Sequence, residues 1–170
     1  MSSIRLLNQP LGGQVGNYIK DYLEDSKYNK LTIIVAFAKN SGVLRLKESL
    51  EAFRKSGGEI DVYVGIDLDG TSYEALVSLL RIVNKLTVVH LESGQTFHPK
   101  IYSFTSDDEG VLIVGSNNLT SGGLWTNIEA SLILSEDNKA EKSEVQKELI
   151  NYIKQLESTT DICFEIKSES

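Results

Sequence analysis

Apolar residues in the first half of the chain form short unbroken runs, and between the runs apolar positions recur three and four residues apart. Unbroken runs are typical of buried strands, and the wider spacing is typical of the helices that cover them. The pattern predicts strands over residues 30–38, 60–66 and 86–91, and helices over residues 15–23, 41–53 and 71–80. Thr71 and Glu74 are spaced as a capping box for the third helix.

In the second half, apolar runs follow one another with only polar turns between them. They predict strands over residues 97–104, 111–114 and 128–134, then a helix over 139–156 and a short strand over 162–164. Strand–helix alternation followed by consecutive strands indicates an α/β fold. We therefore expect a mixed, mostly parallel β-sheet flanked by helices on both faces.

The composition fits one folded domain. The chain has 170 residues, of which 41% are hydrophobic, and its single cysteine, Cys163, excludes an intramolecular disulfide framework. A lone cysteine also suits a reducing cytosol. No apolar run approaches the length that spans a membrane, and residues 1–9 lack the apolar core of a signal peptide. We expect a cytoplasmic protein.

Polar residues able to hold a phosphate stand at the ends of the second-half strands. His98 and Lys100 are two positions apart, so on an extended strand both side chains point to one face. Gly115 ends the next strand and lets the backbone approach an anion closely. Ser116 and Asn118 add a hydroxyl and an amide donor just beyond it.

A carboxylate occupies the third of these strands. Glu129 lies between Ile128 and Ala130, in a strand that otherwise belongs to the core. A carboxylate in such a strand is costly unless something pairs with it. The natural partner is an imidazole N–H of His98, which would fix the tautomer and leave the other ring nitrogen free as a nucleophile.

Each feature has an ordinary explanation when it stands alone. A His-x-Lys triplet occurs by chance, Gly-Ser-Asn-Asn is usually a turn, and Glu129 alone would more often be an edge-strand carboxylate that faces water. The joint pattern, in this order and with these strand contexts, is much harder to obtain by accident.

The joint pattern resembles the phospholipase D superfamily, whose signature is His-x-Lys, usually a following Asp, and then Gly-Ser-x-Asn. The nuclease branch, which includes metal-independent restriction endonucleases, is the most similar. Its His-x-Lys-hydrophobic-Tyr stretch, its Ser/Asn-Phe/Leu-Thr turn and its Asn-Ile-Glu-Ala-Ser strand match residues 98–102, 118–120 and 127–131. Thr105 holds the place of the signature's Asp, and because the nuclease branch often lacks that Asp, the departure weakens a lipase interpretation more than a nuclease one.

The resemblance implies a site and a mechanism. The catalytic residues would be His98, Lys100, Asn118 and Glu129, and the substrate phosphate would be bound by Ser116, Lys100 and Asn118. The implied reaction is cleavage of DNA phosphodiester bonds through a phosphohistidine intermediate, with neither a metal nor another cofactor. Activity is therefore expected to survive EDTA.

The motif occurs once per chain, whereas exchange through histidine needs two imidazoles, one to attack phosphorus and one to protonate the leaving oxygen. We therefore expect a homodimer whose two chains share one active site across a two-fold axis. Residues 1–170 would form a single phospholipase D-like catalytic domain, either alone or as the N-terminal part of a longer protein such as a restriction endonuclease.

The formal net charge of -7 is unusual for a free-standing domain that coats DNA. DNA binding would need a local basic groove, a partner subunit or a DNA-binding domain carried elsewhere. The charge keeps open a non-catalytic nucleic-acid-binding or dimerisation module of a larger restriction or helicase system. A phospholipid or small phosphodiester hydrolase is a further alternative, although no amphipathic lipid-binding helix is evident.

Three other features have simpler interpretations. The acidic turn Asp67-x-Asp69-Gly70 lacks the spaced ligands and the closing Glu of a calcium loop, so no metal site is expected there. His90 is interpreted as a structural or surface residue. Trp125 could stack on a base, but a core or dimer-contact role is favoured.

Overall fold

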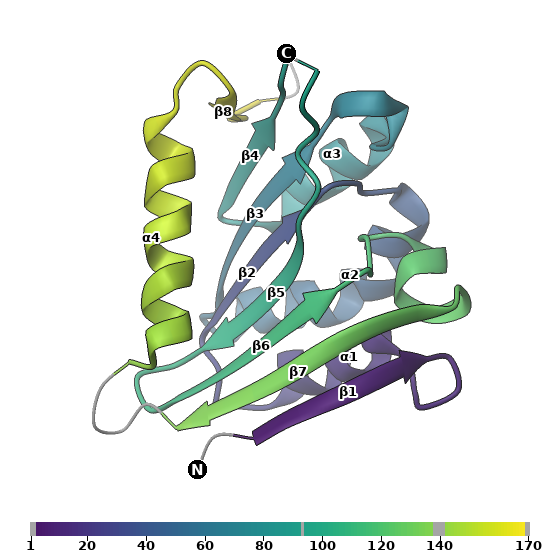
Figure 1. Cartoon of the computed structure of the whole chain (residues 1–170), viewed down its shortest axis with the longest axis vertical. Helices are drawn as coiled ribbons and strands as arrows, with labels where there is room; N and C mark the ends of the chain where they lie inside the picture. The colour runs from purple at the N-terminus through teal and green to yellow at the C-terminus, as the bar shows by residue number, and fades with distance from the viewer. Residues whose placement is uncertain (1–2, 93, 138–141, 169–170) are drawn as a thin grey trace.

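The structure is a computed structural model that describes residues 3–92, 94–137 and 142–168. Within these residues the strands form one eight-stranded sheet in the order β1-β7-β6-β5-β2-β3-β4-β8 (Figure 1). The strands are β1 (Ser3–Gln9), β2 (Lys30–Val35), β3 (Glu59–Gly65), β4 (Lys85–Val89), β5 (Lys100–Thr105), β6 (Glu109–Gly115), β7 (Glu129–Asp137) and β8 (Cys163–Glu165).

The sheet is mixed, as expected, but it is not mostly parallel. Parallel pairing joins only β2 to β3 and β3 to β4 among the described strands. The pairs β1–β7, β7–β6, β6–β5, β5–β2 and β4–β8 are antiparallel. The expectation of a mostly parallel sheet is therefore wrong, because helical crossovers that keep strands parallel are confined to the first half of the chain.

Helices cover both faces of the sheet, which confirms the layered α/β prediction. The helices α1 (Val15–Glu24), α2 (Asn40–Lys55) and α3 (Tyr73–Ile82) lie behind the sheet in Figure 1, and α4 (Glu144–Ser158) lies in front of it. Two short helical turns, η1 (Asp67–Asp69) and η2 (Gly122–Thr126), lie in the connections.

The two faces bury separate apolar clusters. Side chains from α1, α2 and α3, such as Ile19, Leu46 and Leu79, pack on one face in the larger cluster. The smaller cluster forms under α4, where Leu149 and Leu156 lie with residues of the opposite face. The sheet is thus a rigid plate between two apolar layers, and its strand ends can hold side chains in fixed places.

Local details differ from the sequence prediction in three places. The cap of α3 is Ser72, whose hydroxyl accepts a hydrogen bond from the Ala75 N–H, whereas Thr71 donates to the Gly65 carbonyl. The last helix begins at Glu144, and residues 139–141 of its predicted span lie outside the described residues. Strand β1 was not predicted. Among the described helices, none combines the length and apolar character that crossing a bilayer requires.

Candidate active site

The predicted site residues gather at one end of the sheet, where β5 begins, β6 ends and β7 begins. The antiparallel register brings these ends together, since Ile101 lies opposite Val114 and Gly115 lies opposite Ser131. Residues that are up to 31 positions apart in the sequence, from His98 to Glu129, therefore lie near the same strand ends.

His98 and Lys100 are in direct contact. The Lys100 ammonium nitrogen lies 2.6 Å from Nδ1 and 3.1 Å from Nε2 of His98, and it donates a 2.9 Å hydrogen bond to the His98 carbonyl. An ammonium has only donors, so the ring nitrogen nearest to it must present a lone pair. The imidazole itself is exposed and meets Phe37 edge-to-face, with ring centroids 5.7 Å apart.

Lys100 is the buried cation of the site. The residue is only 8% exposed, and among the described residues its ammonium contacts His98 and forms no ion pair with an acidic group. Burial lowers the pKa of Lys100 from its usual value, and the nearby charge of Glu129 partly offsets that effect. A buried ammonium without a bound counter-charge is costly, and an anionic ligand would compensate it.

The segment after β2 connects the histidine strand to the Asn118 loop. The Ala36 N–H donates to the Pro99 carbonyl, and the Leu119 N–H donates to the Phe37 carbonyl. Oδ1 of Asn118 accepts a 3.2 Å hydrogen bond from the Phe37 N–H. This contact fixes the orientation of the amide, and within the described residues the Asn118 NH₂ group has no acceptor, so it is available to a ligand.

Glu129 does not pair with His98, as the sequence had suggested. Its carboxylate accepts hydrogen bonds from the Ser116 hydroxyl and, at 3.2 Å, from the Asn127 side-chain amide. None of the hydrogen bonds in the described parts of the chain joins Glu129 to His98. The prediction of that pair is wrong because β7 directs the carboxylate across β6 to Ser116, whose N–H donates to the Ala130 carbonyl.

The structure explains the glycine at position 115 differently from the sequence prediction. A β-carbon at this position would collide with Ser131 and with the main chain of Ala130. Glycine thus allows β6 and β7 to approach closely at the site end. This approach places Ser116 beside Glu129.

A buried polar network supports the loop, and sequence reasoning missed it. The Asn117 side chain is 1% exposed, donates a 2.6 Å hydrogen bond to the Gly123 carbonyl and accepts one from the Ser131 hydroxyl. Gln9, also 1% exposed, donates to the carbonyls of Gly123 and Asn127. The signal available was the position of Asn117 inside the Gly-Ser-x-Asn motif, where it stood as the variable residue.

Trp125 and His90 have structural roles. Trp125 is 3% exposed, its indole N–H donates to Oδ1 of Asn17, and the Arg45 guanidinium stacks 3.9 Å from a ring centroid. The core role favoured for Trp125 is therefore confirmed. Nδ1 of His90 lies 2.6 Å from Oδ1 of Asp67. In the described residues, the acidic turn and the rest of the fold present no group of three potential metal ligands.

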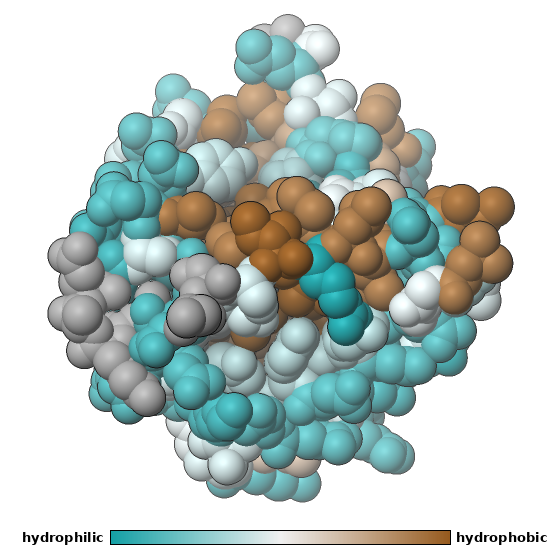
Figure 2. All heavy atoms as spheres, turned by 60° about the horizontal axis from the view of Figure 1, so that its bottom comes forward, coloured by the Kyte–Doolittle hydropathy of each residue, from teal (hydrophilic) through white to brown (hydrophobic). Residues whose placement is uncertain are grey.

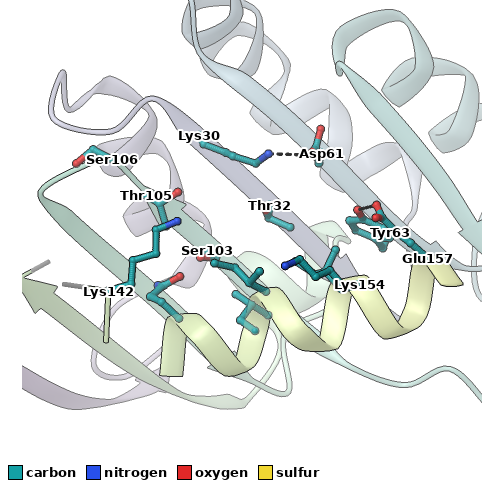
Figure 3. Close-up of a pocket in the computed structure, with 14 residues that line it drawn as sticks. Lys30, Thr32, Asp61, Tyr63, Ser103, Thr105, Ser106, Lys142, Lys154 and Glu157 are labelled. Atoms are coloured by element: carbon teal, nitrogen blue, oxygen red, sulfur yellow. Dashed lines mark hydrogen bonds and ion pairs between the residues drawn. The ribbon is translucent and has the colours of Figure 1, made fainter. Parts of the chain in front are cut away.

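A separate hollow of about 350 Å³ lies between α4 and the sheet, away from the His98 end (Figure 3). Thr105, which holds the place of the signature's Asp, lines this hollow together with Thr32 and Ser103. Tyr63 and Glu157 also line it, and the Tyr63 hydroxyl donates a 2.5 Å hydrogen bond to the Glu157 carboxylate. Thr105 is therefore not part of the His98 site.

The family model of the NgoFVII restriction endonuclease N-terminal PLD (phospholipase D) domain matches residues 16–166. The chain belongs to this family. The match includes every predicted site residue, from His98 to Glu129. No curated protein matches the sequence.

Several solved structures, one of them described as a phospholipase D family member, share the fold of this NgoFVII-type domain. Nuc from Salmonella typhimurium superimposes with a TM-score of 0.68 at 14% identity, over 99% of this chain and 100% of that one. NucT from Helicobacter pylori gives 0.66 at 13% identity, over 94% of this chain and 98% of that one. Phosphatidylserine synthase from Haemophilus influenzae gives 0.69 at 14% identity, over 100% of this chain and 41% of that one. Proteins with different names thus share this fold. The assignment to a restriction-endonuclease type of domain therefore depends on the family match.

Proposed function

We propose that this chain is the catalytic domain of a metal-independent endonuclease that cleaves DNA phosphodiester bonds through a phosphohistidine. The observation that carries the proposal is the buried Lys100 ammonium, which contacts His98 and lacks an acidic ion-pair partner among the described residues. The NH₂ group of Asn118, which has no acceptor within the described residues, adds a neutral donor from the loop after β6. Such a site suits a phosphate diester, and membership of a restriction-endonuclease domain family favours DNA as the substrate.

The first step forms a phosphorus–nitrogen bond. The lone pair of a His98 ring nitrogen attacks phosphorus, and the bond between phosphorus and the leaving oxygen breaks. The second imidazole, His98 of the partner subunit, donates its proton to that oxygen. One strand end departs as an alcohol, and the other remains covalently bound to His98.

The second step restores the enzyme. His98 of the partner subunit, now neutral, takes a proton from water while the water oxygen attacks phosphorus. The phosphorus–nitrogen bond breaks, the electron pair returns to the His98 ring, and a phosphate monoester is released.

The surrounding groups stabilise charge during both steps. Lys100 and the Asn118 amide would face the non-bridging oxygens, which gain charge as phosphorus becomes five-coordinate. Preorganised donors of this kind provide the charge stabilisation that a divalent metal supplies in other phosphodiesterases. Ser116, which is held by Glu129, would donate from the adjacent strand end.

Contact with the remaining DNA backbone requires cations outside the centre. Lys39 is a candidate, because its N–H donates to the Leu119 carbonyl next to Asn118 and its ammonium reaches the Asp69 carbonyl. One lysine is far from a basic groove, and the net charge of the chain is -7. We therefore expect sequence specificity and most of the DNA affinity to come from a partner subunit or from a domain outside residues 1–170.

Cleavage of bis-p-nitrophenyl phosphate and of plasmid DNA in EDTA tests the proposal. We expect the wild-type chain to cleave both and His98→Ala to lose activity by about 10⁴-fold or more, as removal of a nucleophile does. An oligonucleotide labelled at its internal phosphates should also leave an acid-labile, base-stable radioactive adduct on the wild-type protein, whichever strand end departs. Equal residual activity in both proteins would indicate contamination and refute the proposal.

The competing functions give different results in the same experiment. A non-catalytic module would bind DNA without cleaving it in either form. A phospholipid hydrolase would release headgroups from phosphatidylcholine vesicles faster than it cuts DNA. Loss of DNA cleavage only after a stoichiometric divalent metal is removed would refute metal independence.

A further inference from the structure

We infer that the hollow between α4 and the sheet is a second binding site, separate from the His98 site, and that its ligand is a nucleoside monophosphate. We call it the α4 hollow (Figure 3). Its volume of about 350 Å³ lies at the lower end of the range for sites that hold small organic ligands, so it suits a single nucleotide and not a polymer. The inference does not rest on the proposed function, because the two sites share no residue.

The floor of the α4 hollow is polar, although it lies in the middle of the sheet. Thr32 of β2 lies opposite Asp61 of β3 on one side and opposite Ser103 of β5 on the other, so the three residues form one row. Thr32 is 7% exposed and Ser103 3%, and neither hydroxyl forms a hydrogen bond with another described residue. Buried hydroxyls are costly unless something bonds to them. A ribose carries hydroxyl groups that would provide the missing partners.

The neighbouring part of the same sheet face has the opposite character. In Figure 1, β7 and β1 extend beyond α4, and there Leu6 and Leu132 lie opposite each other and are 60% and 49% exposed. Figure 2 shows apolar residues gathered in a band across the side of the molecule that it presents, bordered by hydrophilic residues. The face is thus apolar where it is bare and polar where α4 covers it, the reverse of what contact with water alone would favour. The polar floor therefore indicates a polar ligand.

The acidic residues of the α4 hollow already have cationic partners. The Lys30 ammonium lies 2.9 Å from Oδ2 of Asp61, whose side chain is 13% exposed, and Figure 3 marks this ion pair. Glu157 accepts hydrogen bonds from the Lys85 ammonium and from a tyrosine hydroxyl. Because these charges are compensated within the fold, the two carboxylates can accept from ligand hydroxyls without excluding an anion.

Two further lysines of the α4 hollow have no such partner. Lys142 precedes α4 and Lys154 lies on it, and neither forms an ion pair with an acidic group in the described parts of the chain. In Figure 3, Lys142 points toward Thr105 and Lys154 points over the floor beside Ser103. Two uncompensated cations at one hollow are a local exception in a chain whose net charge is -7. A phosphate group would pair with both through charge-assisted hydrogen bonds.

The wall formed by α4 suits a nucleobase. Leu149, Ile150 and Ile153 line the α4 hollow and can cover the apolar face of a planar ring. Gln146 lies in the same wall, is 3% exposed, and its amide nitrogen has no acceptor among the described residues. If this amide turned toward a ring nitrogen or a carbonyl oxygen of the base, it would be satisfied. Phosphate, sugar and base thus each meet groups of matching chemistry.

Nuclear magnetic resonance of the whole ¹⁵N-labelled chain, titrated with adenosine 5′-monophosphate (AMP), locates the site. We expect AMP to shift the amide signals of β2, β5 and α4 around the hollow. The same shifts should appear in Lys100→Met, in which the His98 site has lost its cation. Shifts confined to the surroundings of His98, or no shifts at all, would overturn the inference.

Isothermal titration calorimetry of Lys100→Met measures what each part of the ligand contributes. We expect AMP to bind about 10-fold or more tightly than either adenosine or inorganic phosphate, because only AMP contacts the lysines, the floor and the wall together. Phosphate that binds as tightly as AMP would mean an adventitious ion only. Adenosine that binds as tightly as AMP would leave the two lysines without a ligand. Either result overturns the inference.

Substitutions in the wild-type chain test the named contacts. Lys154→Met and Thr32→Val should each weaken AMP binding at the hollow by about 10-fold, through loss of a charged and of a neutral hydrogen bond. Lys147→Met is the control, because Lys147 lies on the same helix, pairs with Glu144 and is not one of the residues that line the hollow. It should bind AMP like the wild type.

Circular dichroism melting should show that all three variants fold. Unchanged AMP affinity in Lys154→Met or in Thr32→Val, or an equal loss in Lys147→Met, would contradict the assignment. None of these measurements uses DNA cleavage, so failure of the nuclease proposal would leave the second site standing, and failure of the second site would leave the nuclease proposal standing.

Discussion

The ammonium nitrogen of Lys100 lies 2.6 Å from Nδ1 of His98, inside a strand end where Lys100 is 8% exposed. The two groups are in direct contact, and the burial that lowers the Lys100 pKa makes the charged form costly to keep. The buried charge of Lys100 is therefore energetically unfavourable, and a bound phosphate would stabilise it.

Lys100→Met should separate stability from activity. Methionine has a similar length and no charge, so we expect cleavage to be lost and the free energy of unfolding to rise by about 1 kcal/mol. Chemical denaturation at neutral pH measures the second effect. Lys147→Met, at a half-exposed lysine of α4, is the matched control and should change neither quantity. A clear loss of stability in Lys100→Met would contradict this account.

Glu129→Gln should shift the pH dependence of cleavage. The Glu129 charge raises the Lys100 pKa against the effect of burial, so its removal lowers that pKa further. Since the reaction needs a charged Lys100, the alkaline limb of the kcat/KM profile should move to lower pH. Glutamine can still accept from Ser116, but its NH₂ group then replaces the oxygen that accepts from Asn127, so a thermal melt of the variant must show that the fold is intact. An unchanged alkaline limb would mean that Lys100 is not the group that titrates there.

Asn118→Asp should damage catalysis and spare the fold. The remaining carboxylate oxygen can still accept from the Phe37 N–H, but the free NH₂ group is replaced by a second negative oxygen. We expect kcat to fall by about 10²- to 10³-fold, in line with the loss of one transition-state donor. Steady-state kinetics and a thermal melt measure the two effects. A large fall in melting temperature would contradict the prediction that the fold is spared.

The neighbouring Asn117→Ala variant should behave in the opposite way. Its side chain is buried and donates to the Gly123 carbonyl, and its removal leaves the Ser131 hydroxyl without its acceptor. We expect the free energy of unfolding to fall by about 2 kcal/mol. Urea denaturation of the Asn117→Ala and Asn118→Asp variants, compared side by side, tests whether Asn117 supports the fold while Asn118 binds the substrate.

Acid should weaken the contact between α4 and the sheet. Hydrogen bonds from Lys85 and Tyr63 lower the pKa of Glu157 below its usual value of 4.5. A carboxyl whose folded pKa is depressed stabilises the fold above its unfolded pKa, and that stability is lost as the pH falls through the folded pKa. Glu157→Gln should therefore flatten the fall of melting temperature below pH 4.5. If the melting temperature of the variant falls as steeply as that of the wild type, other carboxylates cause the loss of stability in acid.

Local apolar spacing was sufficient to predict elements whose pattern is set by their own packing. Helix α2 and strand β3 lie within two residues of their predicted limits, because their buried faces repeat regularly. Strand β1 was missed because much of it is exposed, with Leu7 and Gln9 as its only buried residues. The directions of strand pairing could not be predicted from the apolar pattern either, since the sequences of antiparallel β5, β6 and β7 resemble other apolar runs.

The composition of the site was predictable, but its internal contacts were not. Motif spacing placed His98, Lys100, Ser116, Asn118 and Glu129 at neighbouring strand ends. The direction of each side chain depends on the register of β6 and β7, which brings Glu129 to Ser116 instead of His98. Gln9 could not be found because it supports the loop from a strand that had not been predicted.

Gln9 connects the first strand to the loop that supports the candidate active site. Its side-chain amide donates a hydrogen bond to the Asn127 carbonyl, 118 positions later in the chain. The Asn127 side chain in turn donates to the Glu129 carboxylate. Removal of the first nine residues, or a bulky tag that displaces them from the sheet edge, would therefore remove hydrogen bonds that hold the loop of the candidate active site far along the chain. Anyone who prepares this protein for assay should keep that strand intact and attach purification handles elsewhere.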